Sequence, residues 1–213
     1  MKITCQPAPR LWTDATCVCI ASGPSLTAAD VEAVRGRAHV IAVNTSYQLA
    51  PWADALWATD ARWWVLHKGA PTFQGLRFGL AIHTAGFPKG AGIHLLRNDG
   101  TTGLCLDPTG VRNGRNGGYC AINLAVHLGA TRVLLLGYDC APDRGRHHWH
   151  RDHPWPMLSP YFTWRKHFAT LVAPLASAGV TVINCSRTTA LEAFPRQPLE
   201  TALAGVDGAE EVA

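Results

Sequence analysis

The stretch Cys17-Val18-Cys19-Ile20-Ala21-Ser22-Gly23-Pro24-Ser25-Leu26-Thr27-Ala28-Ala29-Asp30 decides the fold of this chain. It begins with an unbroken apolar run, which is typical of a strand buried on both faces. The segment 22–25 cannot extend that strand, because Gly23 permits unusual φ angles and Pro24 lacks an N–H group. Thr27 and Asp30 then have the spacing of a capping box. The stretch therefore predicts a buried strand, a tight turn and the start of a helix.

A turn of this kind leaves backbone N–H groups at the carboxyl edge of a sheet, where α/β proteins hold nucleotides. We therefore expect Gly23, Pro24 and Ser25 to bind the phosphate of an anionic ligand. An ordinary strand-to-helix turn without a ligand is the alternative, because the sequence has neither a Walker lysine nor the three-glycine dinucleotide fingerprint.

The composition predicts one globular domain. The chain has 213 residues, of which 47% are hydrophobic, and this length suits a single core. No apolar run is long enough to cross a membrane, and the N-terminus lacks the apolar core of a signal peptide, so we expect a cytoplasmic protein. Seven cysteines without a Cys-x-x-Cys pair favour reduced thiols over a zinc site or a disulfide framework.

Charge is unevenly distributed along the chain. All 19 lysines and arginines but only 11 of the 15 acidic residues lie at or before Arg196, so this part has a net charge of +8 and the remainder −4. The basic body favours an anionic ligand. We expect a nucleotide-binding domain over residues 1–196 and a disordered acidic tail over 197–213.

Polar side chains follow three further apolar runs. Asn44 follows the run 39–43, Asp60 ends the run 55–60, and Asp139 ends the run 132–139. Because the carboxyl ends of parallel strands share one edge of a sheet, we expect these side chains to meet at a ligand pocket. An amide such as Asn44 can contact a base or a ribose, or it can cap the next helix. Asp60 and Asp139 are candidate Mg²⁺ ligands, with helix capping and ion pairing as alternatives.

The loop Asn113-Gly114-Arg115-Asn116-Gly117-Gly118 precedes a predicted helix over 119–128. Its glycines and its arginine suit a second anion-binding site, for which we single out Arg115, Gly117 and Gly118. A flexible connection is the alternative. A further helix with an aromatic face is expected over 161–177.

The segment 144–156 concentrates four of the ten histidines among arginines and tryptophans. Its prolines and polarity predict a loop, which we interpret as a lid over the pocket. Histidine titrates near neutral pH, so His150 and His153, followed by His148, are the candidate acid/base residues. A polar surface loop without a shared role is one alternative. A transition-metal site formed by His148, His150, Asp152 and His153 is another.

Alternating strands and helices, with several uninterrupted apolar strands, predict the fold class. It is an α/β Rossmann-like domain with a mostly parallel sheet, helices on both faces and a histidine-rich lid loop.

Five short motifs resemble one superfamily. They are Gly23-Pro24-Ser25-Leu26, Val43-Asn44, Trp57-x-x-Asp60, the Gly-Gly-x-x-Ala-x-x-Leu-Ala segment over 117–125, and Leu135-Leu136-Gly137-Tyr138-Asp139. In order and spacing they resemble the group that includes 6-hydroxymethylpterin diphosphokinase-like proteins and bacterial sialyltransferases, many of whose small members are encoded in phages and prophages. Ser22 stands where the sialyltransferases usually have asparagine.

The resemblance implies a transferase that takes a glycosyl or phosphoryl group from a nucleotide donor. The donor would be a CMP-type nucleotide held by the residues equivalent to Gly23–Ser25 and Asn44, with a lid histidine as the base. ATP with Mg²⁺ would serve a diphosphokinase instead. A non-catalytic nucleotide-binding phage protein and a structural virion protein are the remaining hypotheses. The acceptor is open, a nucleic acid included, and so is assembly into a homo-oligomer.

Overall fold

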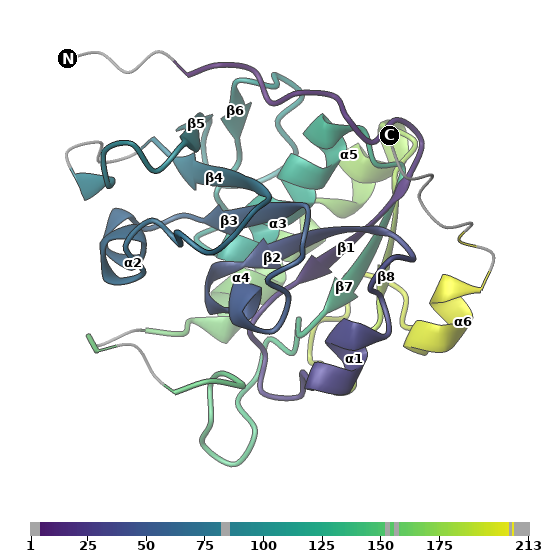
Figure 1. Ribbon diagram of the computed structural model, residues 1–213. Coiled ribbons are helices and arrows are strands. Elements are labelled where there is room, and N and C mark those ends of the chain that lie inside the picture. Colours follow the sequence, from purple (N-terminus) through teal and green to yellow (C-terminus); the bar gives the residue numbers. More distant parts are fainter. Residues whose placement is uncertain (1–4, 82–85, 152–153, 156–157, 205, 207–213) are drawn as a thin grey trace.

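Within the described residues, eight parallel strands form one open sheet (Figure 1). The computed structural model describes residues 5–81, 86–151, 154–155, 158–204 and 206. The strands are β1 (Thr16–Ile20), β2 (His39–Val43), β3 (Ala55–Ala58), β4 (Leu76–Leu80), β5 (Ile93–Asn98), β6 (Gly110–Val111), β7 (Arg132–Leu136) and β8 (Thr181–Asn184), arranged in the order β6-β5-β4-β3-β2-β1-β7-β8. Every strand pair is parallel, so the predicted α/β Rossmann-like fold class is confirmed.

β1 is the strand from which the sheet grows in two directions. The residues Cys17–Ile20 are fully buried, because apolar side chains alternate between two covered faces. β1 pairs with β2 on one side and with β7 on the other. After β1, the strands β2 to β6 follow one another outward on one side of β1. The chain then crosses back to the other side of β1, where β7 and β8 lie. The carboxyl ends of β1 and β7 therefore form the topological switch point, where open α/β sheets bind ligands.

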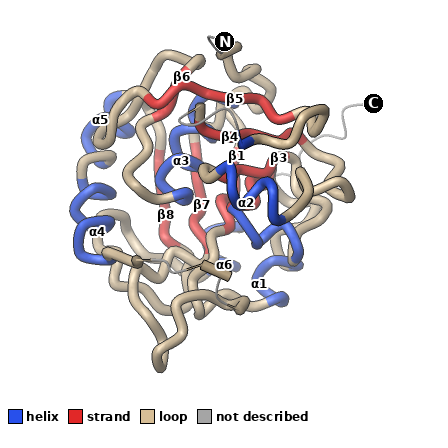
Figure 2. The backbone as a smooth tube through the Cα atoms, turned by 90° about the vertical axis from the view of Figure 1, so that its left-hand side faces the viewer, coloured by secondary structure: helices blue, strands red, loops and turns tan. Residues whose placement is uncertain are grey.

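Helices cover both faces of the sheet (Figure 2). α3 (Gly117–Leu128), α4 (Tyr161–Ala169) and α5 (Val172–Ser177) contribute to the core on the face of Cys17, Cys19 and Leu135. α1 (Ala28–Glu32), α2 (Ala61–Leu66), the short 3-10 helix η1 (Asn44–Gln48) and α6 (Leu199–Leu203) lie on the face of Val18 and Ile20. No helix in the described part of the chain is long and apolar enough to span a bilayer.

The expected helix over 161–177 is two helices. The N–H groups of Thr170 and Leu171 bond the carbonyls three residues earlier, at His167 and Phe168. Pro174 has no N–H group with which to bond the Thr170 carbonyl, so the α-helical pattern cannot run through this point. α4 therefore ends at Ala169 and α5 begins at Val172.

The expected disordered tail begins with an ordered helix. Leu199–Leu203 form α6, whose Ala202 and Leu203 are buried against the sheet. Arg37 adds an ion pair to Glu200 and donates to the Leu203 carbonyl. The prediction of disorder is thus wrong for Leu199–Leu203. It was based on the acidic charge of the tail and overlooked the apolar residues that α6 buries. Residues 207–213 lie outside the described residues.

Candidate functional site

A cavity of about 560 Å³ lies at the switch point, within the size range of small-molecule sites. The ends of β1, β2, β3 and β7, the N-terminus of α3, the helix α4 and the loop after β7 enclose it. The structure brings most of the predicted site residues together here: Gly23, Pro24, Asn44, Asp60, Arg115, Gly117, Gly118, Asp139 and His148 all line the cavity.

The turn after β1 is joined to the end of β7 rather than left free. The Gly23 N–H donates to the Gly137 carbonyl at 2.8 Å. The Ser25 N–H donates to one oxygen of Asp139 at 2.7 Å, and the Ser25 hydroxyl donates to the other at 2.9 Å. A Cβ atom on Gly23 would lie only 2.2 Å from Asp139 Oδ1, so glycine is required for this approach. The backbone N–H groups of Gly23 and Ser25, which were expected to bind a phosphate, are therefore already bonded within the protein.

The Asp139 carboxylate is the hydrogen-bond acceptor for both Ser25 donors. Asp139 is only 3% exposed, and this burial raises the pKa of its carboxyl group. The hydrogen bonds from the Ser25 N–H and hydroxyl lower that pKa in part. Both carboxylate oxygens accept hydrogen bonds from within the protein. Asp139 thus connects two strand ends, and Ser25 supports the cavity without lining it.

Asp60 caps α2 at the rim of the cavity. Its Oδ1 accepts from the Arg62 N–H at 2.9 Å, and its Oδ2 pairs with the Arg62 guanidinium at 3.2 Å. This is the capping and ion-pairing alternative described above.

The N-terminus of α3 opens into the cavity. Asn116 is the N-cap and accepts from the Tyr119 N–H, while the N–H groups of Gly117 and Gly118 have no acceptor among the described residues. A Cβ on Gly117 would lie 3.1 Å from Val43 Cγ1 and 3.3 Å from Asn44 Nδ2, so this glycine lets the helix end approach the end of β2 closely. Free N–H groups and the dipole of a twelve-residue helix favour an anion at this point.

Three cavity residues other than glycine have left-handed backbone conformations. The φ angles are 51° at Asn44, 54° at Arg115 and 50° at Cys140. Such conformations cost energy that the surrounding structure must offset, and they gather at ligand sites.

A buried amide holds the loop that carries Arg115. Asn123, in the middle of α3, is fully buried; its Oδ1 accepts from the N–H groups of Cys105 and Arg112, and its Nδ2 donates to the Cys105 carbonyl. Further along, Asn113 bonds Asn98 through Nδ2 and accepts the Arg115 N–H through Oδ1, at 2.8 Å each. No described carboxylate pairs with Arg115, so its charge is available at the cavity.

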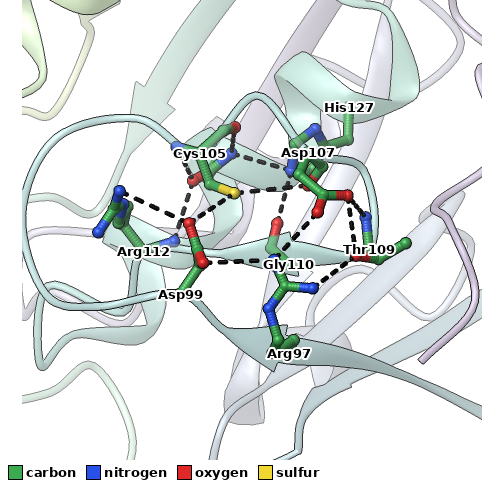
Figure 3. Close-up of polar contacts among 9 residues, drawn as sticks. Arg97, Asp99, Cys105, Asp107, Thr109, Gly110, Arg112 and His127 are labelled. Atoms are coloured by element: carbon green, nitrogen blue, oxygen red, sulfur yellow. Dashed lines mark hydrogen bonds and ion pairs between the residues drawn. The ribbon is translucent and has the colours of Figure 1, made fainter. Parts of the chain in front are cut away.

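A network of charged groups holds the segment 97–112, which precedes the loop that carries Arg115 (Figure 3). Asp99 pairs with Arg97 and Arg112 and accepts from the Cys105 thiol at 3.3 Å. Asp107 accepts from the Thr109 N–H and hydroxyl and from Arg97, and these donors lower the pKa of its carboxyl to about 2. The network thus holds together the segment that leads into the Arg115 loop.

The described part of the histidine loop contributes to the cavity lining. His148 lines it and stacks on His150 with ring centroids 5.0 Å apart, whereas His150 is outside the lining. Trp149 fastens the loop, because its N–H donates to the Ser22 carbonyl and its Nε1 donates to the buried Ser46 hydroxyl.

His153 lies outside the described residues, as does Asp152, so two members of the expected metal set have no described position. Among the residues that are described, no group of three histidine, cysteine or acidic side chains could hold a metal ion.

The sequence predicted an aromatic face on a helix over 161–177 but not that this face forms a wall of the cavity. Tyr161, Trp164 and Phe168 of α4 line it, as does Tyr138, which follows β7. His147 also lines the cavity, with its Nδ1 2.8 Å from the Tyr161 hydroxyl. The α4 residues are spaced as one helical face, so this periodicity was the available signal. An aromatic helix face is more often core than site, and only the tertiary structure distinguishes the two.

The sequence matches no protein-family model and no curated protein. The structure is similar to the MAf glycosyltransferase from Magnetospirillum magneticum AMB-1, with a TM-score of 0.65 and 12% identity over 92% of this chain. The chain spans only 35% of that protein. It is also similar to the sialyltransferase CstII from Campylobacter jejuni, in complex with the substrate analogue cytidine-5'-monophosphate, with a TM-score of 0.51, 11% identity, and coverage of 94% of this chain and 89% of that one. At these identities, the likeness is one of fold: the chain has the Rossmann-like fold seen in these glycosyltransferases.

Proposed function

We propose that this chain is a transferase that moves a glycosyl group from a nucleotide donor to an acceptor hydroxyl. One observation carries the proposal: the N-terminus of α3, Arg115, which pairs with no described carboxylate, and His148 all line a single cavity at the switch point of the sheet. The fold likeness to two glycosyltransferases supports the same reaction class.

The donor phosphate is placed at the end of α3 in this proposal. The N–H groups of Gly117 and Gly118 would bond its oxygens, and the planar guanidinium of Arg115 would pair with its charge. This location replaces the turn at Gly23, whose N–H group is already engaged. Because the CstII structure holds CMP, a cytidine nucleotide is the first donor to test.

The nucleoside and the sugar would occupy the rest of the cavity. Asn44 offers an amide donor and an acceptor beside Gly117, which suits a ribose or base edge. The rings of Tyr161 and Trp164 offer a surface on which a base or a sugar ring can stack.

His148 is the acid/base residue of the proposal, because it is the predicted histidine that lines the cavity. The acceptor oxygen attacks the anomeric carbon of the donor and forms the new C–O bond, while its proton passes to His148. The bond between the anomeric carbon and the phosphate oxygen breaks, and the nucleotide leaves with the electron pair. The end of α3 and Arg115 stabilise the charge that develops on the phosphate.

Diphosphoryl transfer from ATP is less well supported by the described residues. It would require Asp60 and Asp139 to hold Mg²⁺. Asp60 caps α2 and pairs with Arg62, and both Asp139 oxygens accept from Ser25. The carboxylate oxygens that would bind Mg²⁺ are therefore already hydrogen-bonded within the protein.

Calorimetric titration tests the donor. We expect CMP to bind without a metal ion more tightly than UMP, GMP or AMP. Titration with ATP, with and without Mg²⁺, tests the diphosphokinase alternative, since Mg²⁺-dependent ATP binding without CMP binding would reject the glycosyl donor. No binding of any nucleotide would reject the nucleotide site altogether.

The histidine is tested by the hydrolysis of CMP-N-acetylneuraminic acid, in which water replaces the acceptor. His148→Asn should lower turnover by about 100-fold, while CMP affinity stays within about twofold. His150→Asn is the matched control from the same loop, and it should retain most of the turnover. Equal losses in both variants would refute the role given to His148.

A further inference from the structure

A second cavity adjoins the candidate donor site on the side of α2. It has a volume of about 880 Å³ and shares Thr59 and Asp60 with the first cavity. The two cavities therefore lie next to each other where β3 ends and α2 begins.

The lining of this second cavity is mainly apolar. Val65 and Leu66 of α2 are 56% and 45% exposed, which is high for large aliphatic side chains. Leu80, Phe87 and Trp155 complete its apolar surface. Apolar side chains grouped beside a ligand site indicate a surface that binds something apolar.

The charges at this second cavity balance each other. Asp60 and Arg62 form an ion pair at 3.2 Å, and the Arg62 guanidinium also lies 5.3 Å from the centre of the Trp155 ring. No other charged residue is among the described residues that line it. A charged occupant would lose hydration without gaining a partner, so the surface suits an uncharged one.

We propose that this groove, defined by Arg62, Val65, Leu66, Leu80, Phe87 and Trp155, binds the acceptor of the transfer reaction. The acceptor class is an uncharged molecule whose hydroxyl group is carried beside an apolar aliphatic or aromatic body. The apolar body packs on Val65 and Leu66, and the hydroxyl reaches the donor cavity past Thr59 and Asp60. The inference rests on the proposed function, since a transferase needs a second substrate next to its donor.

The probe for the test is 4-methylumbelliferyl β-D-galactoside, an uncharged sugar with an aromatic body, and its binding is measured by fluorescence anisotropy. Methyl β-D-galactoside, which lacks the aromatic body, is measured as a competitor. We expect the first to bind and the second to compete poorly, because the apolar body supplies most of the contact. If the aromatic glycoside does not bind, the inference is overturned.

Val65→Asp is the test variant and Val172→Asp is its matched control. Both valines lie on short helices, and both are partly exposed, at 56% and 43%. Val65→Asp should weaken binding of the aromatic glycoside by at least about tenfold, because it places a charge in the groove, and Val172→Asp should leave it unchanged. Equal affinities in the two variants would overturn the inference. Leu66→Ser replaces Val65→Asp if circular dichroism shows that the latter does not fold.

Two further measurements keep the proposals separate. CMP titration of Val65→Asp reports on the donor site alone, so loss of glycoside binding with intact CMP binding supports the groove. If CMP binds no variant but the glycoside results hold, the proposed function fails and the apolar site remains. If light scattering shows that Val65→Asp converts a dimer into a monomer, the groove binds a second copy of the chain, and the acceptor inference is overturned.

Discussion

At the scale of single residues, a close contact between the turn after β1 and the end of β7 shapes the candidate site. Gly23, Ser25 and Asp139 form this contact through one backbone bond and two bonds to a buried carboxylate. The contact forms one wall of the cavity and leaves neither the Gly23 N–H nor the Ser25 N–H free to bind a ligand.

Gly23→Ala should destabilise the protein by steric overlap. The new Cβ would lie 2.2 Å from Asp139 Oδ1 and 2.5 Å from the Gly137 carbonyl oxygen. We expect the free energy of unfolding to fall by about 3 kcal/mol, as for other overpacked sites. Gly36→Ala is the control, because an added Cβ at Gly36 would meet no atom within 4 Å. Its φ of 69° is left-handed, so this substitution should lower the free energy of unfolding by about 1 kcal/mol through backbone strain alone. Urea unfolding measures both, and equal losses would contradict the overlap.

Ser25→Ala should weaken the protein in a pH-dependent way. Burial puts the folded pKa of Asp139 above its unfolded value, so the native state binds more protons, and ionisation costs stability as pH rises through the raised pKa. Ser25 offsets part of that cost, and loss of its hydroxyl should raise the pKa of Asp139 further.

The loss in unfolding free energy should therefore be larger at about pH 8, on the order of 1–2 kcal/mol, than at about pH 4, where Asp139 is more protonated. Urea unfolding at the two pH values checks this prediction. A loss that is the same at both would show that the hydroxyl does not act on the carboxylate.

At the scale of elements, the site depends on how a helix end and a loop are held. Asn116 caps α3, and the bonds around Asn123 and Asn113 hold the Arg115 loop beside it. The histidine loop depends on Trp149, which bonds Ser22 and Ser46. A rigid sheet thus presents loops that are fastened at a few polar contacts.

Trp149→Leu should loosen the histidine loop while the sheet stays intact. The variant loses the indole donor to the buried Ser46 hydroxyl, a bond of about 1 kcal/mol. Amide hydrogen exchange over 144–151 should become faster by roughly fivefold to tenfold, with unchanged exchange in β1 and β7. Trp52→Leu is the control, because Trp52 packs on the same core from the turn before β3 and forms no hydrogen bond to the described part of the loop, which it should leave unaffected. Unchanged exchange in the loop of Trp149→Leu would show that Trp149 is not its anchor.

At the scale of the whole molecule, two helix layers close the sheet, and the last of their helices is α6. Its Leu203 is 1% exposed within the core that also contains Val18 and Ile20. The end of the described chain is therefore part of the fold that supports the switch point.

Leu203→Ala should lower the free energy of unfolding by about 2–4 kcal/mol, because it leaves a cavity in that core. Leu106→Ala is the matched control at a position that is 71% exposed, and it should change stability by less than about 0.5 kcal/mol. Urea unfolding of the two variants decides the point. A negligible effect at Leu203 would mean that α6 is dispensable.

The sequence by itself determined the central strands β1, β2, β3 and β7, their parallel arrangement and the edge at which polar residues gather. These features are recognised from neighbouring residues alone, so they can be predicted without knowing the tertiary contacts. Examples are the apolar runs 39–43 and 132–136 and the capping box at Thr27. The capping box and the β2 strand lie where they were predicted. The position of Asn44, Asp60 and Asp139 around one cavity follows from the same rule for parallel strands.

Only the tertiary structure decided how those residues are used. The N–H of Ser25 bonds Asp139 across 114 residues, and no local pattern contains that pairing. The loop over 144–151 has no periodicity, so only its anchor at Trp149 determines that His148, and not His150, lines the cavity. The aromatic face of α4 forms a cavity wall because Phe168 packs on Tyr138, which follows β7. Hydrogen bonds and packing between distant segments assign roles that residue type and spacing leave open.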